Sequence, residues 1–466
     1  MRTLASIIER LQSPVARSIT RHARDIHPFA LDRDGPQTIR ISLDGQAIDA
    51  QRGDTVAAAL LRAGITTFTR SIKYHRPRGP FCLQGSCGQC LMRIDGAPSL
   101  LACRVLAEEG MICQRQNAPL GAEKDIFRAA DFLFPEGLDH HHLMTGSRLL
   151  GRVALEVARR LAGLGELPDK PRAPVEAELR KARLVIVGAG PAGLAAARAA
   201  GDALRAAEGG VLLLEREPRP GGGALLAIDP ALPDRDQIAQ MALALQGEVM
   251  LDSECVGLYA NDTALPGNAL VAVRQRGRLL LLIAERVLVA VGGASQPLPF
   301  AGVDRPGVHA ARGLVALPAM VGERLVVVGE GKELVDCARA LRRKGYLLER
   351  VIALGKSWPA AADLPIEENQ PRRALGNPVR ALQVGDSRIH CDAVAIAMNP
   401  APLHELASSV GAHARWVAEV GGFPIQVDGE GRTSVPWLFA AGRCAGLGGS
   451  AALNSGEAAG RAAGRG

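Results

Sequence analysis

The segment LVIVGAGPAGLAAARAAG, residues 184–201, constrains the fold more than any other part of the sequence. Leu184–Val187 is typical of a buried parallel strand, and Gly188, Gly190 and Gly193 follow it as G-x-G-x-x-G where a helical pattern begins. The first glycine allows the turn, the second lets a pyrophosphate approach the backbone, and the third permits close packing of helix on strand. The helix N-terminus directs its positive end at the phosphate. The motif therefore predicts a dinucleotide-binding βαβ unit.

Residues at the ends of other predicted strands extend this candidate site. The strand Val211–Leu214 ends in Glu215, whose carboxylate can accept hydrogen bonds from a ribose diol. Glycines after the strands Val287–Val291 and Leu438–Ala441 let the chain pass beside a bound dinucleotide. Simple turns in an α/β domain are the alternative interpretation. The predicted cofactor-binding residues are Gly188, Gly190, Ala192, Gly193, Glu215, Arg216, Gly222, Gly292, Gly442 and Arg443.

A second glycine turn follows the predicted strand Leu325–Val328 but departs from the motif. Residues 329–334 are GEGKEL, so Leu334 stands where the third glycine belongs. Glu330 and Glu333 put negative charge where a pyrophosphate would sit. We therefore expect a structural domain that does not bind NAD(P), with nicotinamide binding as the alternative.

Four cysteines, Cys82, Cys87, Cys90 and Cys103, are spaced as C-x4-C-x2-C-x12-C. Three thiolates from one tight loop can surround one side of a two-iron cluster, and the fourth arrives from a nearby strand. Small residues in the loop let backbone amides donate hydrogen bonds to the sulfurs. Structural zinc favours two separated C-x2-C pairs, and this segment has one. The spacing predicts a [2Fe–2S] cluster on these four cysteines, with zinc, or four inert buried thiols, as alternatives.

The remaining cysteines show no ligand spacing. We expect Cys113 to be a buried thiol, and Cys255, Cys337, Cys391 and Cys444 lie too far apart in sequence to predict a second cluster. Such cysteine usage favours a reducing cytoplasm over a disulfide framework.

Composition agrees with a globular α/β fold. The 466 residues suffice for two or three domains, and 53 glycines with 3% aromatic residues suit tightly packed α/β layers. The net charge of +7 comes from 55 basic and 48 acidic residues that are mostly interspersed, so we expect no nucleic-acid partner. No apolar run is long enough to predict a membrane-spanning helix.

The order of strands and helices predicts the domains. A hairpin at Asp44-Gly45 and a helix over Thr55–Ala63, capped by Asp54 or Thr55, indicate an α+β, β-grasp-like ferredoxin domain. After it, alternating strands and helices indicate an α/β fold of two dinucleotide-binding domains, glutathione-reductase-like, the second inserted in the first. The predicted bounds are 1–34 for an amphipathic helix, 35–115 for the ferredoxin domain, 116–180 for a helical linker, 181–320 with 405–466 for the FAD-binding domain, and 321–404 for the inserted domain.

Several segments together resemble one protein family. They are Ser71–Gly79 (SIKYHRPRG), residues 158–169 (ARRLAGLGELPD), and the stretches GAGPAGLAAA, VLVAVGGASQPLPF and LFAAGRCAGLGG. In these, over about residues 35–466, the sequence resembles the α-subunit family of heteromeric amine and imino-acid oxidoreductases. That family includes sarcosine oxidase α, the hydrogen cyanide synthase and opine oxidase subunits, and hydroxyproline dehydrogenase α.

The resemblance implies a function as an electron-transfer subunit carrying FAD and the [2Fe–2S] cluster. A partner β-subunit with its own FAD would oxidise the amine, so a hetero-oligomer is expected and no catalytic residue is expected in this chain. An FMN at a subunit interface, and contact with a membrane surface or a quinone acceptor, remain open. The His140–His142 run is expected to be solvated or at an interface, and His75 and Arg76 to contact a phosphate, a subunit or the loop itself.

The sequence departs from the family at three points, and two other functions stay open beside the leading one. Arg443 stands where many such flavoproteins have an Asp for the ribityl chain, and the chain lacks both the C-terminal cysteine cluster of some relatives and the folate-binding half of sarcosine oxidase α. The alternatives are a self-sufficient NAD(P)H-dependent reductase and a non-catalytic assembly subunit that has lost its flavin, the latter suggested by Arg443 and Leu334.

Overall fold

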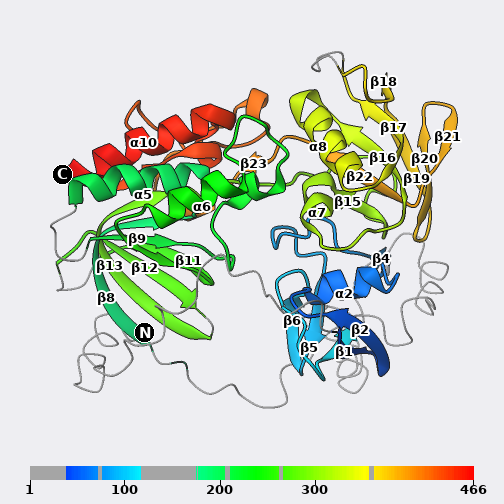
Figure 1. Cartoon of the computed structure of the whole chain (residues 1–466), viewed down its shortest axis with the longest axis horizontal. Helices are drawn as coiled ribbons and strands as arrows, with labels where there is room; N and C mark the ends of the chain where they lie inside the picture. Colours follow the sequence, from blue (N-terminus) through cyan, green and yellow to red (C-terminus); the bar gives the residue numbers. More distant parts are fainter. Residues whose placement is uncertain are drawn as a thin grey trace, which may run out of the picture. The chain divides into compact units, whose positions relative to one another are not determined.

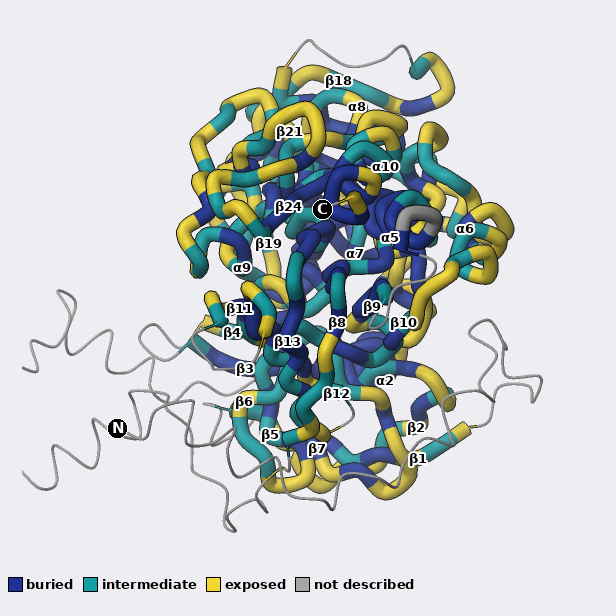
Figure 2. Tube along the Cα trace, turned by 90° about the vertical axis from the view of Figure 1, so that its left-hand side faces the viewer, coloured by how far each residue is buried: buried dark blue, intermediate teal, exposed yellow. Residues whose placement is uncertain are grey.

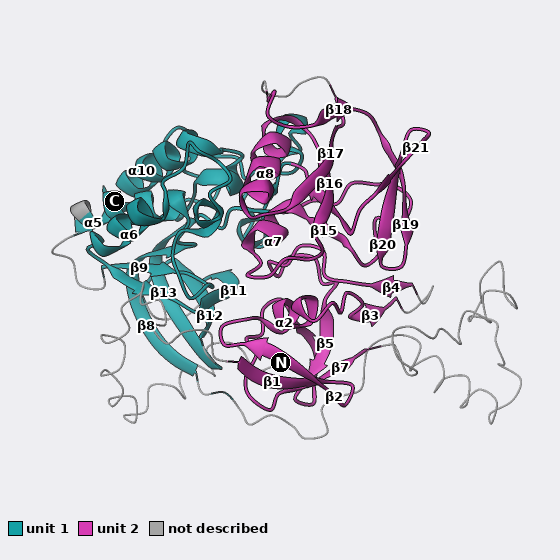
Figure 3. Cartoon of the chain, turned by 45° about the vertical axis from the view of Figure 1, so that its right-hand side comes forward, with its two compact units in different colours: residues 1–33, 173–294, 399–466 teal, residues 34–172, 295–398 magenta. Residues whose placement is uncertain are grey.

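The computed structural model describes residues 38–71, 76–116, 175, 177–204, 210–261, 266–275, 277–355 and 361–465. They form two compact units (Figure 3): unit 1 contains the described residues of 173–294 and 399–466, and unit 2 those of 34–172 and 295–398. The chain thus leaves unit 1 after Ala294 and returns to it at Asn399. The predicted helix of residues 1–34, most of the predicted linker, His75 and the His140–His142 run lie outside the described residues.

The N-terminal part of unit 2 is a five-stranded mixed sheet with one helix (Figure 1). Its strands, in spatial order, are β2 (Gln46–Gln51), β1 (Thr38–Leu43), β7 (Ile112–Arg115), β5 (Leu91–Ile94) and β6 (Ala97–Leu101); β3 (Thr69–Arg70) pairs with β4 (Pro77–Arg78), and the helix is α2 (Val56–Arg62). The predicted hairpin is confirmed, since Asp44 and Gly45 have φ of 50° and 87°, as a tight hairpin turn needs. The predicted helix is confirmed too, with Thr55 as its N-cap.

The second part of unit 2 has a parallel five-stranded sheet and an antiparallel three-stranded sheet. The parallel strands are β15 (Val308–Ala310), β22 (Ala393–Ala397), β16 (Arg324–Gly329), β17 (Leu347–Ala353) and β18 (Ile366–Glu368); the antiparallel strands are β19 (Pro371–Gly376), β20 (Val379–Val384) and β21 (Ser387–His390); the helices are α7 (Ala311–Ala316) and α8 (Gly331–Arg343). The sheet includes β15, which lies upstream of the predicted domain start at residue 321.

Unit 1 is built on one large sheet, with β24 completing it beside β13. Its strands are β10 (Glu248–Met250), β9 (Val211–Leu214), β8 (Ala177–Val187), β13 (Arg278–Val289), β12 (Ala269–Gln275), β11 (Ser253–Ala260) and β24 (Leu438–Ala440), and a short ribbon joins β14 (Gly293–Ala294) to β23 (Ala401–Pro402). The helical segments are α5 (Pro191–Leu204), η2 (Gly222–Leu226), α6 (Arg235–Leu243), α9 (Glu405–Ser408), η3 (Ala418–Val420), η4 (Gly442–Ala445) and α10 (Gly449–Arg465).

Strand β13 organises this sheet. It pairs along its length with β8, while its first half is antiparallel to β12 and its end is parallel to β24. Alternate residues of β8 face opposite sides: Leu184 and Ile186 pack beneath the helices, and Val185 and Val187 pack on the other face. Buried residues accordingly follow β13 and α5 in Figure 2.

Helices α5 and α10 lie side by side on one face of the sheet (Figure 1) and approach backbone to backbone. A Cβ atom at Gly456 would lie 2.1 Å from the Ala192 carbonyl oxygen, and one at Gly460 would lie 2.3 Å from that of Ala196. Only glycine fits these two positions, and the contact fixes α5 behind the predicted dinucleotide turn.

Candidate cofactor sites

The three motif glycines differ in their surroundings. Gly188 has φ of 102°, and a Cβ there would lie 2.5 Å from the Ala290 carbonyl oxygen. At Gly193 a Cβ would lie 1.8 Å from the Gly188 oxygen. At Gly190, by contrast, a Cβ would meet nothing within 4 Å. Gly188 and Gly193 therefore allow close backbone packing. The open space at Gly190 is what the approach of a pyrophosphate requires.

Glu215, directly after β9, binds the glycine turn. Its side chain is buried; Oε2 accepts a hydrogen bond from the N–H of Ala189 at 2.8 Å and Oε1 one from Glu217 at 3.0 Å. Burial raises the pKa of this carboxyl, and the two backbone donors oppose the rise. A carboxylate oxygen has a second lone pair, so both oxygens can still accept from a ribose diol.

The other predicted glycine turns of unit 1 converge on the motif. A Cβ at Gly222 would lie 3.3 Å from the Gly190 Cα, and one at Gly442 would lie 2.7 Å from the Ala192 Cβ. The Gly442 N–H donates to Ser455 Oγ of α10 at 3.0 Å. The sequence reasoning missed Ser455, because nothing in the sequence shows which turn its hydroxyl reaches.

The remaining predicted residues of this site have local surroundings of their own. Gly292 has φ of 78° and open space where a Cβ would point. The Arg443 side chain runs close to Gly293 and Gly448, where added Cβ atoms would lie 2.9 and 2.8 Å from it. Arg216 pairs with Glu217 at 3.4 Å. The turn, the open face of Gly190 and Glu215 fit the pyrophosphate and ribose of FAD.

The sulfurs of the four predicted ligand cysteines lie close together within unit 2. Cys82, Cys90 and Cys103 are buried and Cys87 is partly exposed. Hydrogen bonds from the thiols of Cys103 and Cys87 hold the pKa of Cys82 well below its usual value. The Cys103 thiol also contacts Cys90 and lowers its pKa, while the pKa of Cys103 itself is raised by both contacts. The thiols thus form one connected group.

Backbone amides already point at this group. The N–H groups of Gln84 and Ser86 donate to Cys82 Sγ at 3.4 and 3.2 Å. Left-handed residues turn the loop inward, with φ of 80° at Gly85 and 66° at Gly88. Such donors stabilise thiolates and raise the potential of a cluster bound to them.

Helix α2 holds the segment that carries the fourth cysteine. The N–H of Ala57, in the first turn of the helix, donates to the Ala102 carbonyl at 2.9 Å, and the Ala102 N–H donates to the Cys90 carbonyl at 3.0 Å. An unsatisfied donor at a helix start is thereby used to fix Cys103 beside the loop.

Within the described residues, no group of three or more His, Cys, Asp and Glu side chains could hold a single metal ion. A two-iron cluster takes its thiolates in pairs, two on each iron, so pairwise closeness of the sulfurs is the relevant geometry. The donor set of four thiols with inward amides fits a [2Fe–2S] cluster. Cys113, buried in β7 as predicted, stands apart, and burial raises its pKa to about 11.

A buried ion pair lies at the start of the helix that follows the second glycine turn. Leu334 is fully buried, and Glu333 receives two hydrogen bonds from Arg312 of α7, from Nε at 2.6 Å and Nη2 at 2.8 Å. The Cys337 thiol donates to the same carboxylate at 3.2 Å. The sequence reasoning missed Arg312, which has no motif around it. The pair neutralises the charge of Glu333 without a phosphate.

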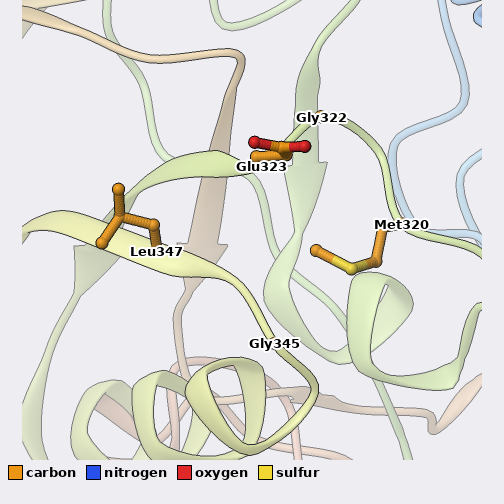
Figure 4. Close-up of a pocket in the computed structure, with 5 residues that line it drawn as sticks. All are labelled: Met320, Gly322, Glu323, Gly345 and Leu347. Atoms are coloured by element: carbon orange, nitrogen blue, oxygen red, sulfur yellow. The ribbon is translucent and has the colours of Figure 1, made fainter.

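A surface pocket of about 530 Å³ lies elsewhere in unit 2 (Figure 4). It is lined by Met320, Gly322, Glu323, Gly345 and Leu347. None of the five is a nucleophile, and Glu323 is the one charged group among them, so the pocket offers no catalytic set. Along the described ranges of the chain, no helix is both long and apolar enough to cross a bilayer.

Comparison with known proteins agrees with this geometry. A solved structure, "Crystal structure of L-proline dehydrogenase from P.horikoshii", superposes with a TM-score of 0.67 at 18% identity, over 93% of this chain and 73% of that one. That likeness confirms the predicted fold class: an α/β flavoprotein fold of two dinucleotide-binding domains with a ferredoxin-like N-terminal domain. Residues 182–463 match the pyridine nucleotide-disulphide oxidoreductase family, and the chain belongs to that family. Residues 36–118 match a 2Fe-2S iron-sulfur cluster binding domain.

Curated relatives confirm the resemblance inferred from the motifs. The alpha subunit of sarcosine oxidase from Rhizobium meliloti is 28% identical over 440 residues, which are 84% of this chain and 43% of that protein. One opine oxidase subunit, from Agrobacterium tumefaciens, is 25% identical over 329 residues, 60% of this chain and 64% of that one. The chain therefore spans less than half of the sarcosine oxidase polypeptide.

Proposed function

We propose that this chain is the electron-transfer subunit of a heteromeric FAD-dependent dehydrogenase or oxidase that acts on an amino or imino acid. A partner flavoprotein of the amine-oxidase type would oxidise the C–N bond, with D-hydroxyproline, an opine or a sarcosine-like secondary amine as substrate. The observation that carries the proposal is the presence in one chain of a dinucleotide turn with Gly190 open and a connected group of four thiols, three of them buried. The names of the relatives, subunits of sarcosine and opine oxidases, support the substrate class.

The chain would bind its two cofactors at separate sites, one at the glycine turn and one at the four cysteines. When bound, FAD accepts electron pairs and a [2Fe–2S] cluster passes single electrons, so together they convert one kind of transfer into the other. The glycine turn and the start of α5 would hold the pyrophosphate, and Glu215 would orient the ribose while it fixes Ala189. The four cysteines would bind the irons, and the amides of Gln84 and Ser86 would stabilise charge on Cys82 Sγ.

No residue of the described ranges is assigned to amine chemistry, which the proposal gives to the partner subunit. The working assembly is accordingly a hetero-oligomer, and we place it in the cytoplasm because its ligand cysteines must stay reduced. An FMN at the subunit interface and contact with a membrane surface or a quinone acceptor belong to this proposal as further expectations.

The decisive experiment is co-expression with the products of neighbouring genes. We expect a flavoprotein partner to co-purify and the complex to reduce a dye when an amine or imino acid is added. Dithionite reduction should give a [2Fe–2S] paramagnetic-resonance signal that is lost in Cys90→Ser and kept in Cys113→Ser, since Cys113 lies outside the thiol group. No partner and no amine-dependent reduction would refute the electron-transfer role.

The two alternative functions, a self-sufficient reductase and an assembly subunit without flavin, require results that differ from those expected for an electron-transfer subunit. A self-sufficient reductase requires NADH or NADPH to bleach the flavin within an anaerobic titration, whereas the Arg312–Glu333 pair in the second turn leads us to expect none. An assembly subunit without flavin requires a preparation that lacks absorbance near ~450 nm, which a bound FAD would supply.

A further inference from the structure

Strand β15 and helix α7 belong to the inserted part of unit 2, residues 295–398, which interrupts unit 1. Both contact the start of the cysteine loop, residues 82–90. The N–H of Ala310 donates to the Phe81 carbonyl at 2.9 Å. One residue earlier, Nδ1 of the fully buried His309 lies 2.7 Å from the Pro80 carbonyl oxygen, so this nitrogen carries the proton and donates. Two successive peptides ahead of Cys82 are thereby bonded to β15.

The contact continues onto Cys82 itself through Gly313. A Cβ added at Gly313 would lie 2.4 Å from the Cys82 carbonyl oxygen and 3.0 Å from the Leu83 Cβ. The helix backbone therefore rests directly on the peptide of the first cysteine, and a side chain at this position would push the loop away.

Helix α7 is in turn fixed to the rest of the inserted part. Arg312 forms the buried pair with Glu333 of α8. At the other end of α7, Lys344 donates from Nζ to the carbonyls of Leu314 and Leu317 and, at 3.3 Å, to that of Val315. A six-residue helix does not hold its own position, so these two contacts give the cysteine loop a rigid support.

We propose that His309 and Gly313 are positioning residues for Cys82, and that the inserted part of the chain holds the cysteine loop in its orientation. This inference goes beyond the proposed function and rests on its ligand set. The amides of Gln84 and Ser86 reach Cys82 Sγ only while the loop keeps its orientation. Hydrogen bonds to a ligand sulfur set the potential of a cluster, so displacement of the loop should change that potential.

Gly313→Ala tests the inference against a matched control, Gly329→Ala. The Cβ of the control would lie 2.1 Å from the Ala397 carbonyl oxygen, a comparable clash in the same parallel sheet, and the three atoms nearest to it all belong to Ala397 and none to the cysteine loop. We expect Gly313→Ala to shift the g values and the midpoint potential of the purified chain, and Gly329→Ala to leave both at their wild-type values. Equal effects, or none, would overturn the inference.

A second measurement does not need the cluster. In the cluster-free full-length chain, mass spectrometry measures the rate at which Cys82 is alkylated. We expect this rate to be several-fold higher in His309→Leu than in wild type. His309→Gln should keep the wild-type rate, because its side-chain amide can still donate to the Pro80 carbonyl. Equal rates in all three chains would refute positioning by His309.

The ligand set and the positioning role can be refuted separately. Wild-type protein without an iron–sulfur signal would overturn the ligand set, and this inference with it. A normal wild-type signal together with unchanged variants would overturn only the positioning role.

Discussion

Arg312→Met is expected to destabilise the inserted part of the chain strongly. The Arg312 and Glu333 side chains are 14% and 7% exposed and are joined by two hydrogen bonds of 2.6 and 2.8 Å. Removing the guanidinium leaves a carboxylate in a dry site, with the Cys337 thiol as a remaining donor. Breaking a buried pair in this way costs about 3–5 kcal/mol of the free energy of unfolding.

Scanning calorimetry of the full chain measures this cost. Unit 2, residues 34–172 and 295–398, falls in the size class of about 150–250 residues, in which 1 kcal/mol corresponds to about 2–4 °C, so the transition of this unit should fall by about 6–20 °C. Arg312→Met combined with Glu333→Leu removes both charges, and we expect it to melt within about 5 °C of wild type, because apolar replacement of a buried pair is often neutral or better.

The exposed pair of Arg372 and Asp386, with side chains 59% and 97% exposed, is the control. Arg372→Met should cost less than about 1 kcal/mol. A wild-type melting temperature for Arg312→Met would refute this prediction. So would a fall in the melting temperature of the double variant as large as those of Arg312→Met and Glu333→Leu added together.

Three further predictions concern other parts of the molecule. Gly193→Ala should abolish FAD retention and lower the melting temperature, because its Cβ would lie 1.8 Å from the Gly188 carbonyl oxygen. Gly190→Ala should weaken FAD binding but leave the melting temperature of the flavin-free chain unchanged, because its Cβ would meet nothing within 4 Å. Cofactor extraction and calorimetry measure the two effects. Burial lowers the pKa of His309 from 6.5 to about 4. Between these values the unfolded chain takes up a proton that the folded chain refuses, so stability should fall by on the order of 3 kcal/mol as the pH drops from 6.5 to 4, and urea titrations of His309→Gln should lack this slope. Gly456→Ala should separate α10 from α5, with a lower melting temperature and loss of FAD; unchanged values would contradict the backbone contact 2.1 Å away.

Local chemistry made part of this structure predictable from sequence. The Asp44-Gly45 hairpin, the Thr55 cap and the strand Leu325–Val328 depend on residues next to one another, and all three are confirmed. The spacing of a motif likewise reflects one turn of backbone, which is why Gly190 and Cys82 could be singled out without a structure. Their roles as ligands stay predictions.

Tertiary packing decides what the sequence could not reveal. Arg312 and Glu333 belong to different helices, and no periodicity tells which carboxylate a guanidinium will meet. Gly456 and Gly460 show the four-residue spacing of a close helix contact, yet the partner helix lies far upstream in the sequence. His309 was overlooked because a lone histidine in an apolar strand carries no signal of the peptide it will bond.

Strand β24 and helix α10 are synthesised after every other described strand, although they complete the layer around the glycine turn. As the chain leaves the ribosome, the edge of β13 at Val287–Val289 must wait for Leu438–Ala440, and the glycine-matched face of α5 must wait for α10. Every strand of the interrupting segment emerges in between. The strands of unit 2 can therefore all be in place while β13 of unit 1 still has an unpaired edge, which persists until these two last elements emerge.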